Sequence, residues 1–134
     1  MATHKKATEK QIENSILEYL EAKKYYAIKH QRIGLFDTKI NKFRMSNNRF
    51  HRRGIADIQT FIQTRVASWP TGLPIFATTS LFLEVKTDVG RQSDAQKEFQ
   101  NNVEKAGCIY KIVRSIDDVE KVIKKIKETN NCNY

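Results

Sequence analysis

Residues 81–115 constrain the fold of this chain most, because they describe a strand, a helix and a second strand in that order. The run LFLEVKT (81–87), apolar apart from Glu84 and its last two residues, predicts a strand. Ser93 then begins a Ser-x-x-Gln capping box, which opens a helix that ends at Gly107. The run CIYKIVRS (108–115) predicts the second strand. Because a helix between two strands of one sheet gives a right-handed crossover with parallel strands, this segment predicts an α/β fold.

The segments on either side of this unit predict further elements of the same core. Thr8 is an N-cap candidate for an amphipathic helix over 9–24, whose apolar residues recur at close to helical spacing. Aromatic and β-branched residues favour strands over 25–33 and 54–66. Residues 115–129 predict a closing amphipathic helix. The predicted order is αβββαβα, with a mixed central β-sheet flanked by helices.

Three stretches fall outside these predicted elements. We expect a basic loop over 38–54, a long hairpin connection or small insertion over 67–80, and a frayed tail over 129–134. Trp69, in the second stretch, is expected to pack in the core rather than to stack on a base. With 134 residues the chain has the size of one ordinary domain, and we expect a single domain over 1–134.

Positive charge is concentrated in the first half of the chain. The formal net charge is +9, and residues 1–56 hold 13 basic against five acidic residues, whereas residues 57–134 hold 11 against 10. Such an excess attracts polyanions, and aromatic rings within it can pack on sugars or unstacked bases, which favours nucleic acid over a merely solvated loop. The acid-free segment 38–54 contains six basic and three aromatic side chains: Lys39, Lys42, Arg44, Arg49, Arg52, Arg53, Phe43, Phe50 and His51.

Composition also limits where the protein works. No apolar run approaches the roughly 20 residues that span a bilayer, and the first ten residues lack the apolar segment of a signal peptide. The two cysteines, Cys108 and Cys132, lack metal-ligand spacing, which favours a reducing interior. We therefore expect a cytoplasmic protein with no membrane partner and no small-molecule cofactor. The compact form would suit a phage or virus, in which case the location is the host cytoplasm.

Two carboxylates and a lysine are the residues that indicate chemistry. Glu84 and Lys86 share one face of the predicted strand, whose other face is apolar. Asp57 stands at the start of the preceding strand, and if the strands pair as a hairpin, Asp57 and Glu84 can offer oxygens to Mg²⁺ or Mn²⁺, with the Val85 backbone carbonyl as a third ligand. Lys86 can then stabilise negative charge on a phosphate or orient an attacking water. The ordinary alternative is a salt bridge between Glu84 and Lys86.

Three segments resemble a known nuclease family: GIAD (54–57), LFLEVKTDVGRQSDAQKEFQNNVEKAG (81–107) and YKIVRSIDDV (110–119). They are similar to the virus-type replication-repair nuclease (VRR-NUC) family of the PD-(D/E)XK nuclease superfamily, and the resemblance covers nearly the whole chain. It implies the PD-(D/E)XK, restriction-endonuclease-like core. One departure is Ala56, which stands where the superfamily usually has Pro before the acid. Ala can adopt the same extended geometry, so we expect the site to be retained.

The resemblance also implies roles for single residues. Asp57 and Glu84 correspond to the metal ligands and Lys86 to the catalytic lysine, and Gln96 corresponds to a helix residue that faces the site. Family members carry an acid in the first helix, which TEKQIENSIL maps to Glu9, with Glu13 less favoured.

Three of these candidate residues have ordinary alternatives. Glu9 is also a first-turn acid that the helix dipole favours, and Gln96 is also the capping partner of its helix. Arg91 lies beside the site under the resemblance, where it can contact a phosphate, or it is a surface arginine in a glycine turn.

The function that the resemblance implies is metal-dependent endonucleolytic hydrolysis of DNA phosphodiesters. Standalone members resemble Holliday-junction resolvases, which act as symmetric homodimers because two symmetric incisions need two active sites. We therefore expect a homodimer that acts on four-way junctions or other branched DNA. The alternatives are a nuclease for flaps, nicks or single strands, and a non-catalytic DNA-binding protein that retains the nuclease fold.

Overall fold

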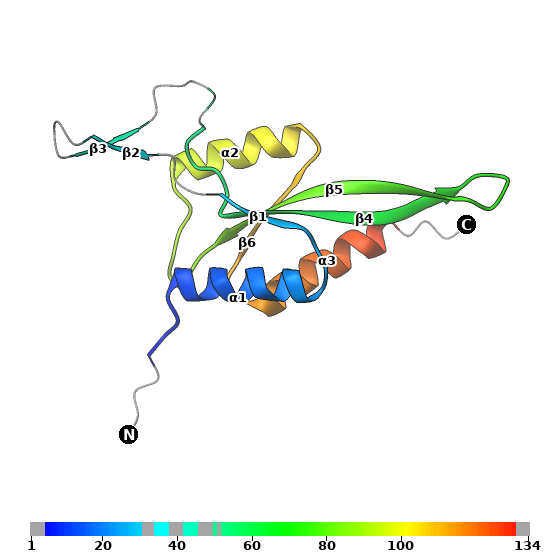
Figure 1. The fold of residues 1–134 in the computed structure, drawn as a ribbon, viewed down its shortest axis with the longest axis horizontal. Helices are drawn as coiled ribbons and strands as arrows, with labels where there is room; N and C mark the ends of the chain where they lie inside the picture. The colour runs from blue at the N-terminus through cyan, green and yellow to red at the C-terminus, as the bar shows by residue number, and fades with distance from the viewer. Residues whose placement is uncertain (1–4, 31–33, 38–41, 46–49, 51, 131–134) are drawn as a thin grey trace.

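The computed structural model describes residues 5–30, 34–37, 42–45, 50 and 52–130. Within these residues the chain forms three helices and six strands (Figure 1). In chain order the elements are α1 (Glu9–Ala22), β1 (Ala27–Lys29), β2 (Gly34–Asp37), β3 (Lys42–Met45), β4 (Ile58–Ser68), β5 (Pro74–Val85), α2 (Asp94–Lys105), β6 (Ile109–Val113) and α3 (Ile116–Asn130).

Four of the strands form one mixed sheet in the order β1-β4-β5-β6. β4 pairs antiparallel with both β1 and β5, whereas β6 runs parallel to β5, as predicted for a strand that follows a helical crossover. Leaving aside β2 and β3, the elements follow the predicted order αβββαβα. The predicted α/β class with a mixed, helix-flanked sheet is therefore confirmed.

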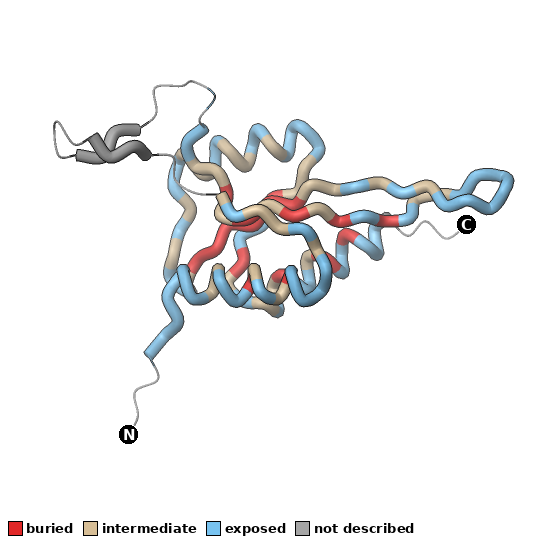
Figure 2. Tube along the Cα trace, viewed as in Figure 1, coloured by how far each residue is buried: buried red, intermediate tan, exposed pale blue. Residues whose placement is uncertain are grey.

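The two faces of the sheet are covered by different helices (Figure 1). Residues on one face of β5, such as Leu81, Leu83 and Val85, pack in the main core with the buried residues of α1 and α3. On the opposite face Phe82 and Tyr110 form a second cluster with apolar residues of α2. This division follows from strand alternation, which sends successive side chains to opposite faces. Figure 2 shows the buried residues concentrated where the helices cover the sheet.

The helices begin at the predicted capping residues. Thr8 caps α1 and Ser93 caps α2, each through a complete capping box with the glutamine three residues later. The helix α2 is followed by Gly107 in a left-handed conformation, with φ of +91°. Ser115 accepts a hydrogen bond from the backbone of Asp118 at the start of α3. These local signals fixed where each helix starts.

The predicted basic loop over 38–54 is partly wrong. Residues 42–45 are strand β3, which pairs antiparallel with β2 as a separate two-stranded ribbon. The prediction relied on charge, whereas backbone pairing in a ribbon does not exclude basic side chains. Of the described part of the predicted strand over 25–33, only residues 27–29 form a strand, β1. Residues 31–33, 38–41, 46–49 and 51 lie outside the described residues.

The predicted connection over 67–80 is mostly strand, because β4 continues to Ser68 and β5 begins at Pro74. Pro74 is the first residue of its strand, a position where its missing N–H is tolerated. Only residues 69–73 form the turn, where the Trp69 N–H donates to the Leu73 carbonyl at 2.8 Å. Trp69 is 60% exposed, so the expectation that it packs in the core is wrong.

The end of the chain is more regular than expected. α3 continues to Asn130, so the first two residues of the predicted frayed tail are helical, because the amphipathic pattern of α3 packs its apolar side on the core up to Ile126. Residues 131–134 lie outside the described part of the chain. In that described part, no helix is both long enough and apolar enough to cross a bilayer.

Candidate active site

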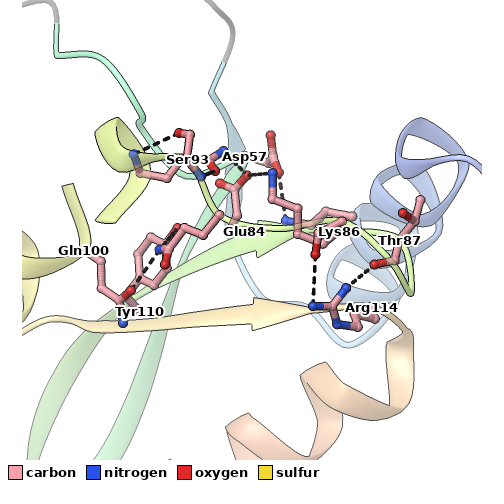
Figure 3. A network of polar contacts seen from close by, with 12 residues as sticks. Asp57, Glu84, Lys86, Thr87, Ser93, Gln100, Tyr110 and Arg114 are labelled. Atoms are coloured by element: carbon pink, nitrogen blue, oxygen red, sulfur yellow. Dashed lines mark hydrogen bonds and ion pairs between the residues drawn. The ribbon is translucent and has the colours of Figure 1, made fainter. Parts of the chain in front are cut away.

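The end of β5 and the residue that follows it bring a buried acid and a buried base together. Glu84 is 2% exposed and Lys86 9%, and the Lys86 Nζ lies 3.3 Å from the Glu84 Oε1 (Figure 3). Both side chains are on the face of β5 that Phe82 shares, opposite the main core. The predicted placement of Glu84 and Lys86 on one face is therefore confirmed, and their ion pair is buried rather than solvated.

Asp57 lies beside this pair, immediately before β4 begins at Ile58. Its Oδ2 accepts a hydrogen bond from the Val85 N–H at 2.8 Å, which fixes the carboxylate between the ends of β4 and β5. Its backbone carbonyl accepts from the His30 N–H at 2.8 Å. The antiparallel pairing of β4 with β5 thus brings the two predicted acids together. Val85 contributes its N–H to Asp57, and the role of its carbonyl as a ligand stays a prediction.

Gly54 allows the segment before Asp57 to pass very close to α2. A Cβ built on Gly54 would lie 2.3 Å from the carbonyl carbon and oxygen of Ala95, and the φ of Gly54 is +71°. Any other residue would clash with backbone and would also be strained. Ala56 is fully buried in the cluster under α2, so packing holds the residue that precedes Asp57.

Burial dominates the electrostatics of the two acids. Burial, and then the negative charge of Asp57, raise the pKa of Glu84 to about 7, against the lowering effect of Lys86. Burial also raises the pKa of Asp57, and Glu13 and Glu9 add to this rise, whereas the Val85 N–H and Lys86 oppose it. The positive charge of Lys86 therefore does not compensate for the burial and mutual repulsion of Asp57 and Glu84.

The two oxygens of Glu84 differ in their contacts. Its Oε1 contacts Lys86 and Gln96, whereas its Oε2 is buried with no hydrogen-bond partner among the residues that the structure describes. A buried carboxylate oxygen without a partner is costly, and a cation would satisfy it. Among the described residues no group of three His, Cys, Asp or Glu side chains is arranged to hold a metal ion. Two carboxylates with raised pKa values and one free oxygen nevertheless fit a hard divalent cation.

Gln96 serves both of the roles considered for it. Its Oε1 accepts from the Ser93 N–H at 2.8 Å, which completes the capping box of α2. Its Nε2 donates to the Glu84 Oε1 at 2.5 Å. The capping interaction therefore orients the amide so that its nitrogen points at the site. A catalytic role for Gln96 stays a prediction.

Two acids of α1, Glu9 and Glu13, lie near the site. Glu9 is exposed, and its Oε1 would lie 3.3 Å from a Cβ built on Gly90, next to Lys86. Glu13 lies one turn further along, with a side chain only 14% exposed and its Oε1 3.2 Å from the Lys29 Nζ. Glu13 raises the pKa of Asp57 more than Glu9 does, whereas Glu9 acts on Glu84. The choice between the two helix acids stays open.

Arg114 is a residue of this region that the sequence did not single out. It follows β6, and its guanidinium donates to the Thr87 carbonyl and, at 3.2 Å, to the Gly90 carbonyl (Figure 3). It thereby ties down the loop that leaves β5 directly after Lys86. The two carbonyls are 27 and 24 residues away in the chain, so no local pattern could have identified the contact.

The predicted DNA-binding residues are only partly placed. Arg52 and Arg53 are exposed just before Gly54, and Arg91 is exposed in the loop after β5. These three therefore flank the segments that carry Asp57 and Lys86. The other four lie on β3 or outside the described residues: Lys42 and Arg44 on β3, Lys39 and Arg49 outside.

A cavity of about 300 Å³ lies elsewhere, where the start of α1 faces the start of α3. Its lining includes Gln11, Ser15 and Arg114 but none of Asp57, Glu84 or Lys86. The cavity is therefore not where the acids meet, and their chemistry is a better guide to the site.

Comparison of the chain with models of protein families, with curated proteins and with solved structures finds no match.

Proposed function

We propose that this protein is a metal-dependent endonuclease that hydrolyses DNA phosphodiesters, built on a PD-(D/E)XK-type core. The observation that carries the proposal is the environment of Glu84, a buried carboxylate that has a lysine on one oxygen and, among the described residues, no hydrogen-bond partner on the other. Burying such a group costs stability unless a partner compensates its charge, and groups of this kind cluster at functional sites. The adjacent Asp57 adds a second carboxylate, and a divalent cation would balance the negative charge that Lys86 leaves uncompensated.

Asp57, Glu84 and the Val85 carbonyl would hold Mg²⁺ or Mn²⁺. The cation supplies Lewis-acid stabilisation of the negative charge on the reacting phosphate when it is bound. It would also favour the ionised form of both acids, whose pKa values burial raises. Glu9 or Glu13 would complete the acidic side of the site, since both act electrostatically on Asp57.

The remaining residues orient the site and the phosphate. Gln96 and Lys86 both contact the Glu84 Oε1, which leaves Oε2 for the metal. The Lys86 ammonium also stabilises negative charge that develops on the phosphate in the transition state. Arg91, exposed in the loop after β5, would contact a flanking phosphate.

The preferred substrate in this proposal is branched DNA, including four-way junctions, cut by a homodimer in the cytoplasm of the cell or of an infected host. Arg52 and Arg53 place positive charge next to the segment that leads into Asp57, and the ribbon of β2 and β3 adds Lys42 and Arg44 to the same stretch of chain. These charges supply affinity for phosphate but no reading of base sequence. Selectivity would therefore come from the shape of the DNA.

The test is cleavage of a labelled four-way junction and a matched linear duplex, with Mg²⁺, Mn²⁺ or a chelator. We expect paired incisions in the junction that need the metal and are lost in Lys86→Ala, whereas Lys111→Ala, at an exposed position of β6, cuts normally. A monomer that cuts linear duplex equally well would contradict the homodimeric, junction-selective part of the proposal.

A second candidate is a non-catalytic DNA-binding protein with the same core. It is favoured by the finding that no three metal-ligating side chains come together among the described residues. Tight, salt-sensitive DNA binding without cleavage under any metal condition would support this candidate and exclude the enzyme.

A further inference from the structure

Beyond α2, one face of the β4–β5 hairpin has no helix over it among the described residues. α2 covers this face at Phe82, near the carboxylates, whereas α3 lies on the opposite face, and the hairpin extends beyond α2 (Figure 1). Pairing places the members of each facing pair on the same face of the sheet. Moving outward from Glu84, the facing pairs on this face are Gln59–Phe82, where α2 covers Phe82, and then Phe61–Ser80, Gln63–Thr78 and Arg65–Phe76.

Two exposed aromatic rings stand on this face. Tyr26, just before β1, is 72% exposed and stacks on Phe61 with ring centroids 6.3 Å apart and planes 25° apart. Phe76 is 52% exposed and faces Arg65 further out. Phe61 supports one side of the Tyr26 ring, which leaves the other side for a ligand. Exposed rings fixed on a sheet are the means by which several folds stack unpaired bases.

The charge of this face suits a polyanion. From Ile58 to Leu83 the chain contains no acidic residue, and its one charged residue is Arg65. The side chains between the rings are uncharged and polar, such as Gln63 and Thr78, and so lack the continuous apolar area that a stable second copy of the chain would bury. The face is also continuous with the acidic site, since Glu84 and Phe82 lie on the same side of β5.

We propose that this face binds an unpaired nucleic-acid strand whose bases stack on Tyr26 and Phe76, next to the phosphate that is cut. The inference rests on the proposed nuclease function and narrows its substrate to branched DNA with a single-stranded segment. Tyr26 stacks on Phe61, and Phe76 faces Arg65. Phe61 and Arg65 are four residues apart on β4, which is about 13 Å at about 3.3 Å per residue. This is roughly the length of four stacked nucleotides.

The test measures binding without cleavage. Fluorescence anisotropy with a labelled 12-nucleotide strand and its matched duplex, in the presence of chelator, compares wild type with Tyr26→Leu and Phe76→Leu. Leucine keeps apolar area but removes the ring, so we expect binding of the strand to weaken roughly 5- to 150-fold in each variant. Binding of the duplex should hardly change. Tyr26→Phe and Phe76→Tyr keep a ring and should bind the strand as wild type does.

Three results would overturn the inference. They are unchanged binding of the strand by both leucine variants, equal weakening for strand and duplex, or a dimer in sedimentation that the leucine variants dissociate. Circular dichroism of each variant checks folding. Because Tyr26 and Phe76 are exposed at separate positions, the remaining leucine variant still tests the inference if one of the two fails to fold. A wild type that binds the strand through these rings but never cuts would retain this inference and remove the proposed enzyme. Metal-dependent cutting by the wild type, together with unchanged strand binding by both leucine variants, would retain the proposed enzyme and remove the inference about this face.

Discussion

The strand pair β4 and β5 has one buried, charged end and one exposed, nearly uncharged end. At the buried end Glu84 and Lys86 are 2% and 9% exposed, whereas on the hairpin beyond α2 Trp69 and Phe76 are 60% and 52% exposed. The usual preference of charged residues for water and of aromatic residues for the core is reversed at both ends. Covering helices and neighbouring strands therefore decide burial here, and the two reversals coincide with the two surfaces for which we propose a function.

Removing Lys86 is expected to have the largest effect on the buried end. Lys86→Ala deletes the cation that contacts Glu84 and, in the proposed mechanism, the phosphate, so cleavage should fall by about 10²- to 10³-fold. Single-turnover cleavage of the branched substrate measures this. An effect below about threefold would show that Lys86 is only a structural partner of Glu84.

Two glycines offer a matched comparison of the two ends. A Cβ at Gly54 would meet the Ala95 backbone at 2.3 Å, whereas one at Gly72, in the hairpin turn, would meet nothing within 4 Å. Both have positive φ, so both alanine variants carry backbone strain of about 1–2 kcal/mol. Gly54→Ala should lose about 3 kcal/mol or more in denaturant unfolding because the clash adds to the strain. Equal losses at the two positions would contradict the close approach at Gly54.

The stability of the metal-free protein should fall as the pH rises from about 4.5 to about 7. The pKa of Glu84 is raised to about 7 in the folded state, so the unfolded state loses its proton first as the pH rises. The contribution of protonated Glu84 to the free energy of unfolding is therefore fully present below the ordinary pKa of about 4.5 and is lost as the pH rises through about 7. Asp57, whose pKa is also raised, acts in the same direction.

Glu84→Gln should remove most of this pH dependence. By the size of the shift, the variant should be more stable than wild type at pH 8 by roughly 3 kcal/mol, although it loses activity. Urea unfolding at pH 5 and pH 8, with chelator present, gives the comparison. A variant that is less stable than wild type at pH 8 would mean that ionised Glu84 is well compensated within the protein.

Substitutions at the exposed end of the hairpin should change the free energy of unfolding least. Trp69→Ser changes a side chain that is 60% exposed in the turn, so the free energy of unfolding should change by no more than about 0.5 kcal/mol. By contrast, Ile62→Ala removes a fully buried side chain of the same strand and should cost about 2–5 kcal/mol. Comparable losses in the two variants would mean that the hairpin tip is covered in solution.

Local patterns explain what the sequence could predict. The strand, helix and strand over 81–115 and the capping of α1 and α2 depend on neighbours a few residues apart. Strand alternation placed Glu84 and Lys86 on one face, and the assumption of a β4–β5 hairpin brought Asp57 to them. The convergence of the three candidate residues could therefore be derived without a structure.

Long-range contacts explain what the sequence could not. The two prolines and the glycine within 67–80 predict a connection there, yet pairing between β4 and β5 makes residues 74–80 a strand. Arg114 donates hydrogen bonds to two backbone carbonyls that lie more than 20 residues away in the chain. Glu13, considered less than Glu9, is the more buried of the two helix acids because Lys29 and the sheet lie against it. Composition does not record such partners.

The most direct test of the account is Mn²⁺ binding by the protein alone at pH 8, followed by electron paramagnetic resonance of the free ion. The acids that carry the proposed chemistry should bind at least one ion per chain, and Glu84→Gln, which keeps the shape of the site but not its charge, should lose that ion. No binding by wild type, or equal binding by Glu84→Gln, would contradict a metal site at Asp57 and Glu84.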